Sequence, residues 1–258
     1  MPETSKPNTQ AASAWFARPK PNPQARLRLF CFPYAGGSAL AFRKWPQHLP
    51  PGVEVLAAQL PGRGVRIREA PFTNLHALVE ELGRAVRPHL DRPFALFGHS
   101  MGAMVGFELA RLLRREGGPA PEHLFVSGRR APQLPDTDPT TYNLPDAELV
   151  EEVRRLNGTP PEVLEHPELM ELMLPLLRAD FEVVETYDYR PEPPLACPVS
   201  AFGGLQDFEV KREHLEGWRE HTTSEFALRM FDGDHFFLQR AEPALLRTVA
   251  RELHRHGA

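Results

Sequence analysis

The fold of this 258-residue chain is decided by the stretch Pro93-Phe94-Ala95-Leu96-Phe97-Gly98-His99-Ser100-Met101-Gly102-Ala103-Met104. The apolar run at 94–97 predicts a short buried strand, and from 103 onward apolar residues recur at the spacing of a helix that ends near 114–118. Between them lies Gly98-x-Ser100-x-Gly102, the pattern of a nucleophile elbow. A serine on such a strand-to-helix turn projects its hydroxyl clear of the sheet.

The two glycines and the flanking elements distinguish this pattern from a chance match. Glycine two residues before and after the serine leaves room for the neighbouring backbone at a strained turn. At average glycine and serine usage, a chain of this length matches the pattern by chance about one time in ten. Because a strand pattern precedes the match and a helix pattern follows it, the stretch predicts a functional serine.

Composition excludes several classes of protein. Hydrophobic residues make up 41% of the chain and charged residues 25%, which suits one sizeable globular domain with or without an insertion. The net charge of −4 gives no basic footprint for nucleic acid, and no apolar run approaches the ~20 residues of a membrane span. Residues 1–14 lack the apolar core of a signal peptide, and Cys31 and Cys197 lie in apolar contexts that predict buried, reduced thiols. We expect a cytoplasmic monomer that binds neither nucleic acid nor membrane.

Strands and helices alternate along most of the chain. Short apolar runs predict strands at 27–32, 53–60, 94–97, 123–127, 198–202 and 226–231. Amphipathic patterns predict helices at 74–90, 103–115, 211–220 and 243–254. This alternation predicts an α/β protein with a mostly parallel sheet covered by helices on both faces. The expected core comprises residues 25–130 and 195–258, after a loose tail at 1–24 in which Trp15-Phe16 anchors to the domain edge.

The alternation stops between residues 131 and 194, where no strand pattern occurs. Helical patterns cover 146–156, 161–165 and 167–186, and we expect residues 131–194 to form an inserted helical lid over the elbow. The segment 169–177 is apolar almost all round, and Pro175 within it is expected to kink or split its helix. The surplus apolar surface of this lid would suit an acyl chain.

A serine hydroxyl needs a base to become a nucleophile, and the ends of the predicted strands supply one. In an open parallel sheet the carboxyl ends of the strands converge on one crevice. His235 follows the last predicted strand and Asp207 follows the one before it, so we predict the catalytic triad Ser100, Asp207 and His235. That order along the chain is the order of α/β-hydrolases. Asp234 is the alternative acid, and His99 is expected to pack with its side chain turned away.

Two backbone amides are expected to form an oxyanion hole. One is the N–H of Met101, the residue after the nucleophile, and the other is the N–H of Ala35 in the glycine-bearing loop 33–38. A second glycine-bearing loop, 61–64, could bind an anion through Arg63, although a turn with a structural arginine is favoured.

Taken together, these motifs resemble the type II (editing) thioesterases of polyketide and nonribosomal peptide biosynthesis, which have the α/β-hydrolase fold. The resemblance runs from about residue 15 to the end of the chain. One departure is Tyr34, where the family more often has histidine. The segments that carry the resemblance are Trp15-Phe16, Cys31-Phe32-Pro33-Tyr34-Ala35-Gly36-Gly37-Ser38-Ala39, Gln59-Leu60-Pro61-Gly62-Arg63-Gly64, Phe97-Gly98-His99-Ser100-Met101-Gly102, Leu177-Arg178-Ala179-Asp180-Phe181-Glu182, Gly203-Gly204-Leu205-Gln206-Asp207 and Gly233-Asp234-His235-Phe236-Phe237-Leu238.

The resemblance implies a serine hydrolase that removes acyl groups from the phosphopantetheine arms of carrier proteins and so clears misprimed or stalled synthases. It implies no metal and no organic cofactor, because the phosphopantetheine belongs to the substrate. A general serine carboxylesterase or an acyltransferase on the same fold is the alternative, and a catalytically inactive interaction module is disfavoured by the complete triad. Arg129 and Arg130, just past a predicted strand end, are candidates for docking an acidic carrier protein.

Overall fold

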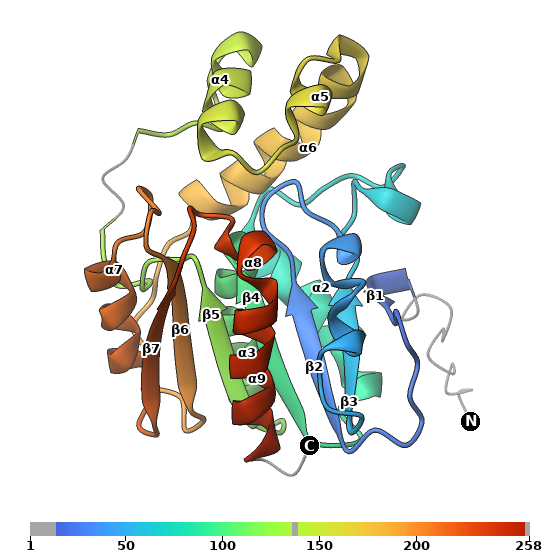
Figure 1. Cartoon of the computed structure of the whole chain (residues 1–258), viewed down its shortest axis with the longest axis vertical. Helices are drawn as coiled ribbons and strands as arrows, with labels where there is room; N and C mark the ends of the chain where they lie inside the picture. The colour runs from blue at the N-terminus through green and yellow to red at the C-terminus, as the bar shows by residue number, and fades with distance from the viewer. Residues whose placement is uncertain (1–13, 136–138, 256–258) are drawn as a thin grey trace, which may run out of the picture.

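A seven-stranded sheet organises the part of the chain that this computed structural model describes, residues 14–135 and 139–255 (Figure 1). The strands lie in the order β1-β3-β2-β4-β5-β6-β7 and pair in parallel, except that β1 runs antiparallel to β3. The predicted fold class is confirmed. The strands are β1 (Phe16–Ala17), β2 (Leu27–Phe32), β3 (Val53–Ala58), β4 (Phe94–His99), β5 (His123–Ser127), β6 (Val199–Gly204) and β7 (Phe226–Phe231).

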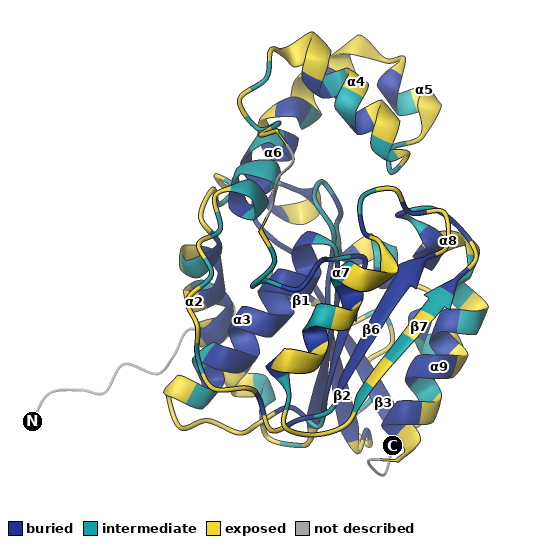
Figure 2. Cartoon of the chain, turned by 90° about the vertical axis from the view of Figure 1, so that its left-hand side faces the viewer, coloured by how far each residue is buried: buried dark blue, intermediate teal, exposed yellow. Residues whose placement is uncertain are grey.

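Helices cover both faces of this sheet. The first face carries α2 (Leu75–Val86), α3 (Met101–Arg115) and α7 (Arg212–Glu216), and the second carries α8 (Phe237–Arg240) and α9 (Glu242–His254). Figure 2 shows the sheet between α3 and α9, with the buried residues of both helices turned inward. Because both faces are covered, β2 to β6 are buried along their whole length. The edge strand β7 is only partly buried.

Short 3-10 helices complete the connections on both faces. Trp45 and Trp218 lie in two of them and are fully buried, and they pack against Phe97 of β4 and Phe107 of α3 respectively. Each tryptophan therefore fixes its connection to the body of the domain. The 3-10 helices are η1 (Ala39–Phe42), η2 (Trp45–Gln47), η3 (Gly64–Arg66), η4 (Arg87–His89) and η5 (Gly217–His221).

The carboxyl ends of the parallel strands lie along one edge of the sheet. Near these ends Phe32 of β2 is in register with Gly98 of β4, and His99 is in register with Ser127 of β5. The loops that follow β2, β4, β6 and β7 therefore emerge at the same edge, as expected for an open parallel sheet. These loops carry the residues predicted to act in catalysis.

Three helices lie beyond this edge of the sheet, at the top of Figure 1. They are α4 (Asp146–Leu156), α5 (Pro161–Leu164) and α6 (Pro167–Glu185), within two residues of the ranges expected for the lid. Since the three helices pack on one another, the lid has a small apolar core of its own. That core consists of Leu149, Val153, Leu164, Met170, Leu174 and Leu177.

The longest described helix, α6, continues through Pro175. Of the kink or split expected at Pro175, the split is therefore wrong. Proline removes the hydrogen bond to the carbonyl four residues earlier, which is that of Glu171. Glu171 and Pro175 are both exposed, so water can bond that carbonyl and the helix persists. Neither α6 nor any other described helix is long and apolar enough to cross a membrane.

The chain is fixed to the sheet well before the expected boundary at residue 24. β1 pairs with β3, and its Phe16 is buried in the core, which is the edge anchor expected from the sequence. Glu54 of β3 accepts hydrogen bonds from the side chain of Arg18 and from the backbone N–H of Asn22. Beyond the Trp15-Phe16 anchor, the expectation of a loose tail is therefore wrong for residues 17–22, and residues 1–13 lie outside the described part of the chain.

Candidate active site

Ser100 lies at the turn between β4 and α3 in a backbone conformation that few residues adopt. Its φ of 53° and ψ of −116° store local strain. A Cβ on Gly98 would lie 1.9 Å from the carbonyl oxygen of Gly102, and a Cβ on Gly102 would lie 2.1 Å from the carbonyl oxygen of Phe32. Only glycine fits at both positions, so the steric explanation for the two glycines of the elbow is confirmed.

A buried carboxylate holds the imidazole of His235 in place. Oδ2 of Asp207 lies 2.8 Å from Nδ1 of His235, and both residues are 7% exposed. Oδ1 of Asp207 accepts hydrogen bonds from the backbone N–H groups of Glu209 and Val210 at 2.9 and 3.0 Å. These three contacts fix the carboxylate, and the carboxylate in turn fixes the ring so that Nε2 is left for another partner.

The alternative acid, Asp234, is engaged elsewhere. Its Oδ1 accepts a hydrogen bond from the backbone N–H of Phe236, and its Oδ2 accepts one from the side-chain amide of Asn157. Asn157 caps the end of α4, so Asp234 ties the lid to the loop after β7. The structure thus brings Asp207, and not Asp234, against the imidazole of His235.

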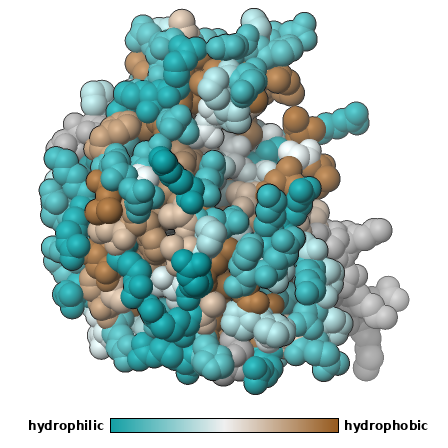
Figure 3. Space-filling view, in the orientation of Figure 1, coloured by the Kyte–Doolittle hydropathy of each residue, from teal (hydrophilic) through white to brown (hydrophobic). Residues whose placement is uncertain are grey.

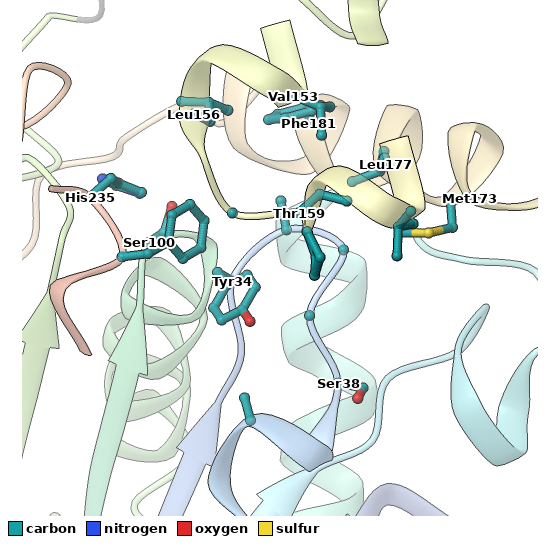
Figure 4. Close-up of a pocket in the computed structure, with 18 of the residues that line it drawn as sticks. Tyr34, Ser38, Ser100, Val153, Leu156, Thr159, Met173, Leu177, Phe181 and His235 are labelled. Atoms are coloured by element: carbon teal, nitrogen blue, oxygen red, sulfur yellow. The ribbon is translucent and has the colours of Figure 1, made fainter. Parts of the chain in front are cut away.

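Ser100 and His235 line one cavity of about 290 Å³ between the body and the lid. In Figure 4 these two residues lie at one end of the cavity, and Met173 of α6 lies toward the other. Figure 3 shows a mostly hydrophilic outer surface on the lid, with apolar side chains gathered where the lid meets the body. The cavity therefore suits an apolar group whose reacting carbon lies beside Ser100. The lid contributes much of the apolar lining, from Val153, Leu156, Val163, Met173, Leu177 and Phe181.

His99 lies beneath the proposed catalytic histidine. It is fully buried, its Nδ1 is 2.9 Å from the hydroxyl of Ser127, and its ring centroid is 5.2 Å from that of His235. Burial, and secondarily the charge of His235, hold the pKa of His99 well below its ordinary value. His99 therefore stays neutral and packs, as expected, and the rings that it packs against include that of His235 as well as those of Tyr34, Phe236 and Phe237.

The two predicted oxyanion donors belong to segments that border the cavity. Ala35 lines it directly, in a turn closed by the hydrogen bond from the N–H of Gly37 to the carbonyl of Tyr34 at 2.9 Å. Met101 is the first residue of α3, so its N–H has no acceptor within the helix. The role of both amides as oxyanion donors stays a prediction.

Arg63 is a structural arginine, as the sequence favoured. It forms a bidentate ion pair with Asp180 of α6, with N–O distances of 2.7 and 2.8 Å. Arg63 is 5% exposed and Asp180 is 2% exposed, and a carboxylate already occupies the guanidinium. The alternative of an anion-binding loop is therefore wrong. The partnership itself was not predicted, and its signal in the sequence is that Asp180 lies at helical spacing between Leu177 and Val183, on the buried face of α6.

The hypothesis that Arg129 and Arg130 dock a carrier protein fails for Arg130 and stays a prediction for the half-buried Arg129. Arg130 is 8% exposed, and its guanidinium donates a hydrogen bond to the carbonyl of Pro135. The backbone carbonyl of Arg129 accepts a hydrogen bond from the indole of Trp218. Because a docking charge must be reachable from solvent, the hypothesis is wrong for Arg130.

The geometry of the elbow and its neighbours agrees with the known proteins that this chain resembles. The family model of the thioesterase domain matches residues 27–253. The chain belongs to the thioesterase family. This thioesterase is 47% identical over 244 residues to LgrE, the linear gramicidin dehydrogenase of Brevibacillus parabrevis, and the match covers 93% of both chains. The name of LgrE is that of a dehydrogenase, whereas an elbow serine that shares a cavity with a buried histidine–carboxylate pair is the arrangement of a hydrolase.

Two solved structures show which kind of thioesterase this chain resembles. RedJ, the thioesterase of the prodiginine pathway in Streptomyces coelicolor, is 43% identical with a TM-score of 0.85, and 93% of this chain matches 98% of RedJ. BorB, a type II thioesterase from the borrelidin biosynthetic cluster, is 41% identical with a TM-score of 0.86 over the same shares. The resemblance to type II thioesterases and the α/β-hydrolase fold are therefore confirmed. The chain is a thioester hydrolase of the serine hydrolase class.

Proposed function

We propose that this thioesterase releases acyl groups from the phosphopantetheine arms of carrier proteins and so clears misprimed or stalled chains from a polyketide or nonribosomal peptide synthase. The observation that carries this proposal is the shared cavity, in which Ser100 and the Asp207–His235 pair border an apolar lining supplied by the lid. A thioester on a long, flexible arm can reach a recessed serine, and its acyl group can lie against the lid. RedJ and BorB come from the prodiginine pathway and the borrelidin biosynthetic cluster, which supports the same substrate class.

In this proposal Ser100, His235 and Asp207 act as a catalytic triad. Nε2 of His235 takes the proton of the Ser100 hydroxyl as the Ser100 oxygen attacks the thioester carbonyl carbon. The π electron pair of that carbonyl moves onto its oxygen, which becomes the oxyanion. The oxyanion collapses, the C–S bond breaks, and His235 gives its proton to the leaving thiolate. The products of this half-reaction are an acyl-Ser100 ester and a free thiol on the arm.

The second half-reaction uses the same groups with water as the nucleophile. His235 takes a proton from water as the water oxygen attacks the acyl-Ser100 ester, and the proton then returns to the oxygen of Ser100 as the carboxylic acid leaves. Asp207 holds Nδ1–H and stabilises the imidazolium in both halves. The N–H groups of Ala35 and Met101 stabilise the oxyanion, each worth about 10²–10³ in kcat. These steps call on no metal or organic cofactor.

The compartment and the assembly state are part of the same proposal. Cys31 and Cys197 are both free and buried, which fits a reducing environment. Burial raises the pKa of the Cys197 thiol to about 12, so it stays protonated and unreactive. The cysteines thus support the expected cytoplasmic location, and the monomeric state and the carrier-domain partners stay predictions.

The test is an acyl-release assay with carrier proteins loaded with short, medium and branched acyl groups. Mass spectrometry follows the free acid and the carrier with its free thiol, and Ser100→Ala is the control. We expect stoichiometric release of acid and thiol, with a larger kcat/KM for carrier thioesters than for oxyesters of the same acyl groups. A larger kcat/KM for the oxyesters would identify a general carboxylesterase. Transfer of the acyl group to an added alcohol or amine in preference to water would identify an acyltransferase.

A further inference from the structure

The loop that carries the proposed oxyanion donor Ala35 is held from the lid side. The next amide along the chain, the N–H of Gly36, donates a hydrogen bond to Oδ2 of Asp180 in α6 at 2.7 Å. Gly36 has a φ of +73°, and a Cβ on it would lie 2.6 Å from Cδ2 of Leu177, also in α6. Thus α6 packs directly on this loop, and only a glycine with its N–H turned toward Asp180 fits between them.

A second residue holds the other side of the same turn. Nη1 of Arg63 donates to the carbonyl of Gly37 at 3.1 Å while the guanidinium pairs with both oxygens of Asp180. Asp180 therefore accepts hydrogen bonds from one backbone amide and two guanidinium nitrogens; the ion pair is buried and the bond to the amide is partly buried. Charge-assisted bonds of this kind are strong and geometrically specific. They fix the peptide units on the C-terminal side of Ala35.

We propose that Asp180 is a positioning residue for the oxyanion hole, through which the lid helix α6 and Arg63 set the direction of the Ala35 N–H. This inference rests on the proposed role of Ala35. An oxyanion donor is effective only when its direction is fixed before the charge develops. Because the Asp180 carboxylate on α6 bonds both the Gly36 amide and Arg63, packing of α6 on the loop and assembly of the oxyanion hole then occur together.

The test compares two ways of removing the carboxylate with a matched control. Asp180→Asn removes the charge and keeps the size, whereas the double variant Arg63→Met/Asp180→Leu removes the whole ion pair without leaving a buried charge unpaired. The control is Glu54→Gln, which alters a buried ion pair with Arg28 in β2 and β3, outside the residues that line the cavity. Melting temperature, kcat and KM are measured with a small carrier-free acyl thioester. The inhibition constant of an alkyl trifluoromethyl ketone is also measured, because its adduct with Ser100 is an oxyanion.

For both Asp180 variants we expect kcat to fall by about 10²–10³ with little change in KM, and the inhibition constant of the ketone to rise by a similar factor. Glu54→Gln should lower the melting temperature without that change in the inhibition constant. A fall in kcat with an unaltered inhibition constant would overturn the proposal, as would folded variants with near-normal kcat. Wild-type turnover of the small thioester but not of acyl-carriers would count against the proposed carrier substrate and leave this test intact.

A measurement on the unaltered enzyme covers the case in which the variants do not fold. If Asp180 holds the Gly36 amide, that amide should exchange with deuterium much more slowly than an amide without a hydrogen bond, because exchange requires the bond to Asp180 to open. Rapid exchange of the Gly36 amide in a protein whose α6 stays protected would overturn the proposal.

Discussion

Asp207 and His235 are 28 residues apart in the sequence, and Oδ2 of the one lies 2.8 Å from Nδ1 of the other. The cause lies in the sheet. β6 and β7 are parallel neighbours, with Gly204 in register with Phe231, so the loops that follow them begin side by side. Two residues that share no local sequence pattern thereby become hydrogen-bonded partners.

We predict that Asp207→Asn lowers kcat by up to about 10⁴, because an amide favours the wrong tautomer of the imidazole. Asp234→Asn is the matched control, since Asp234 bonds Asn157 and the backbone of Phe236 and not the ring. It should leave kcat within a few-fold of the wild type. Steady-state kinetics on a small acyl thioester decide the matter, and the reverse ranking of the two variants would make Asp234 the acid.

Replacing Ser100 separates chemistry from stability. Ser100→Ala should abolish turnover and labelling by a serine-directed phosphonate at nearly unchanged stability. Ser100→Gly should be equally inactive but raise the free energy of unfolding by about 1 kcal/mol relative to the alanine variant, because glycine relieves the strain at φ 53°. Urea unfolding measures the difference. Residual hydrolysis in either variant would remove Ser100 from its role.

The steric account of the elbow makes opposite predictions for two glycines close together in the chain. Gly98→Ala should prevent folding or abolish activity, because the new Cβ would lie 1.9 Å from a backbone oxygen that cannot move aside. Gly106→Ala, within α3, should leave the enzyme active and as stable or up to ~1 kcal/mol more stable, because its Cβ would meet nothing closer than 3.5 Å. Expression, melting temperature and kcat test both, and a folded, active Gly98→Ala enzyme would refute the account.

The lid lining predicts how the preference for acyl length can be changed. Met173→Trp fills part of the cavity and should lower kcat/KM for long acyl groups more than for acetyl. Leu172→Trp is the matched control one residue away on the same helix, where the side chain is 59% exposed. Leu172→Trp should leave kcat/KM unchanged both for long acyl groups and for acetyl. If both variants alter the length profile equally, the acyl chain lies outside this cavity.

A buried histidine outside the active site predicts the acid sensitivity of the fold. Burial, and secondarily the charge of Arg111, lower the pKa of His221 to about 4, whereas the unfolded chain has a histidine pKa of about 6.5. Between these values the unfolded state binds more protons, so stability is full above pH 6.5 and is lost as the pH falls toward 4, by about 1–3 kcal/mol. The free energy of unfolding of His221→Gln should fall less over this range, and that of the exposed control His48→Gln should follow the wild type. Urea unfolding at several pH values distinguishes them.

The sequence by itself determined the elements and the candidate triad. The strand–elbow–helix pattern around Ser100 depends on neighbours a few residues away, so local rules sufficed for it. The same holds for the strand ends that precede Asp207 and His235, since the order of parallel strands brings their following loops to one edge. The α/β class and the three lid helices followed from hydrophobic periodicity in the same way.

Tertiary structure alone decided the contacts that depend on packing between distant segments. No local pattern predicts that Asp180 accepts hydrogen bonds from Arg63 and Gly36, because these bonds exist only once α6 lies on the loop after β2. The burial of Arg130, just past a predicted strand end, was missed for the same reason. Periodicity reports which face of an element is apolar, but which charged groups are enclosed with a partner depends on how whole elements pack, and that is a property of the assembled fold.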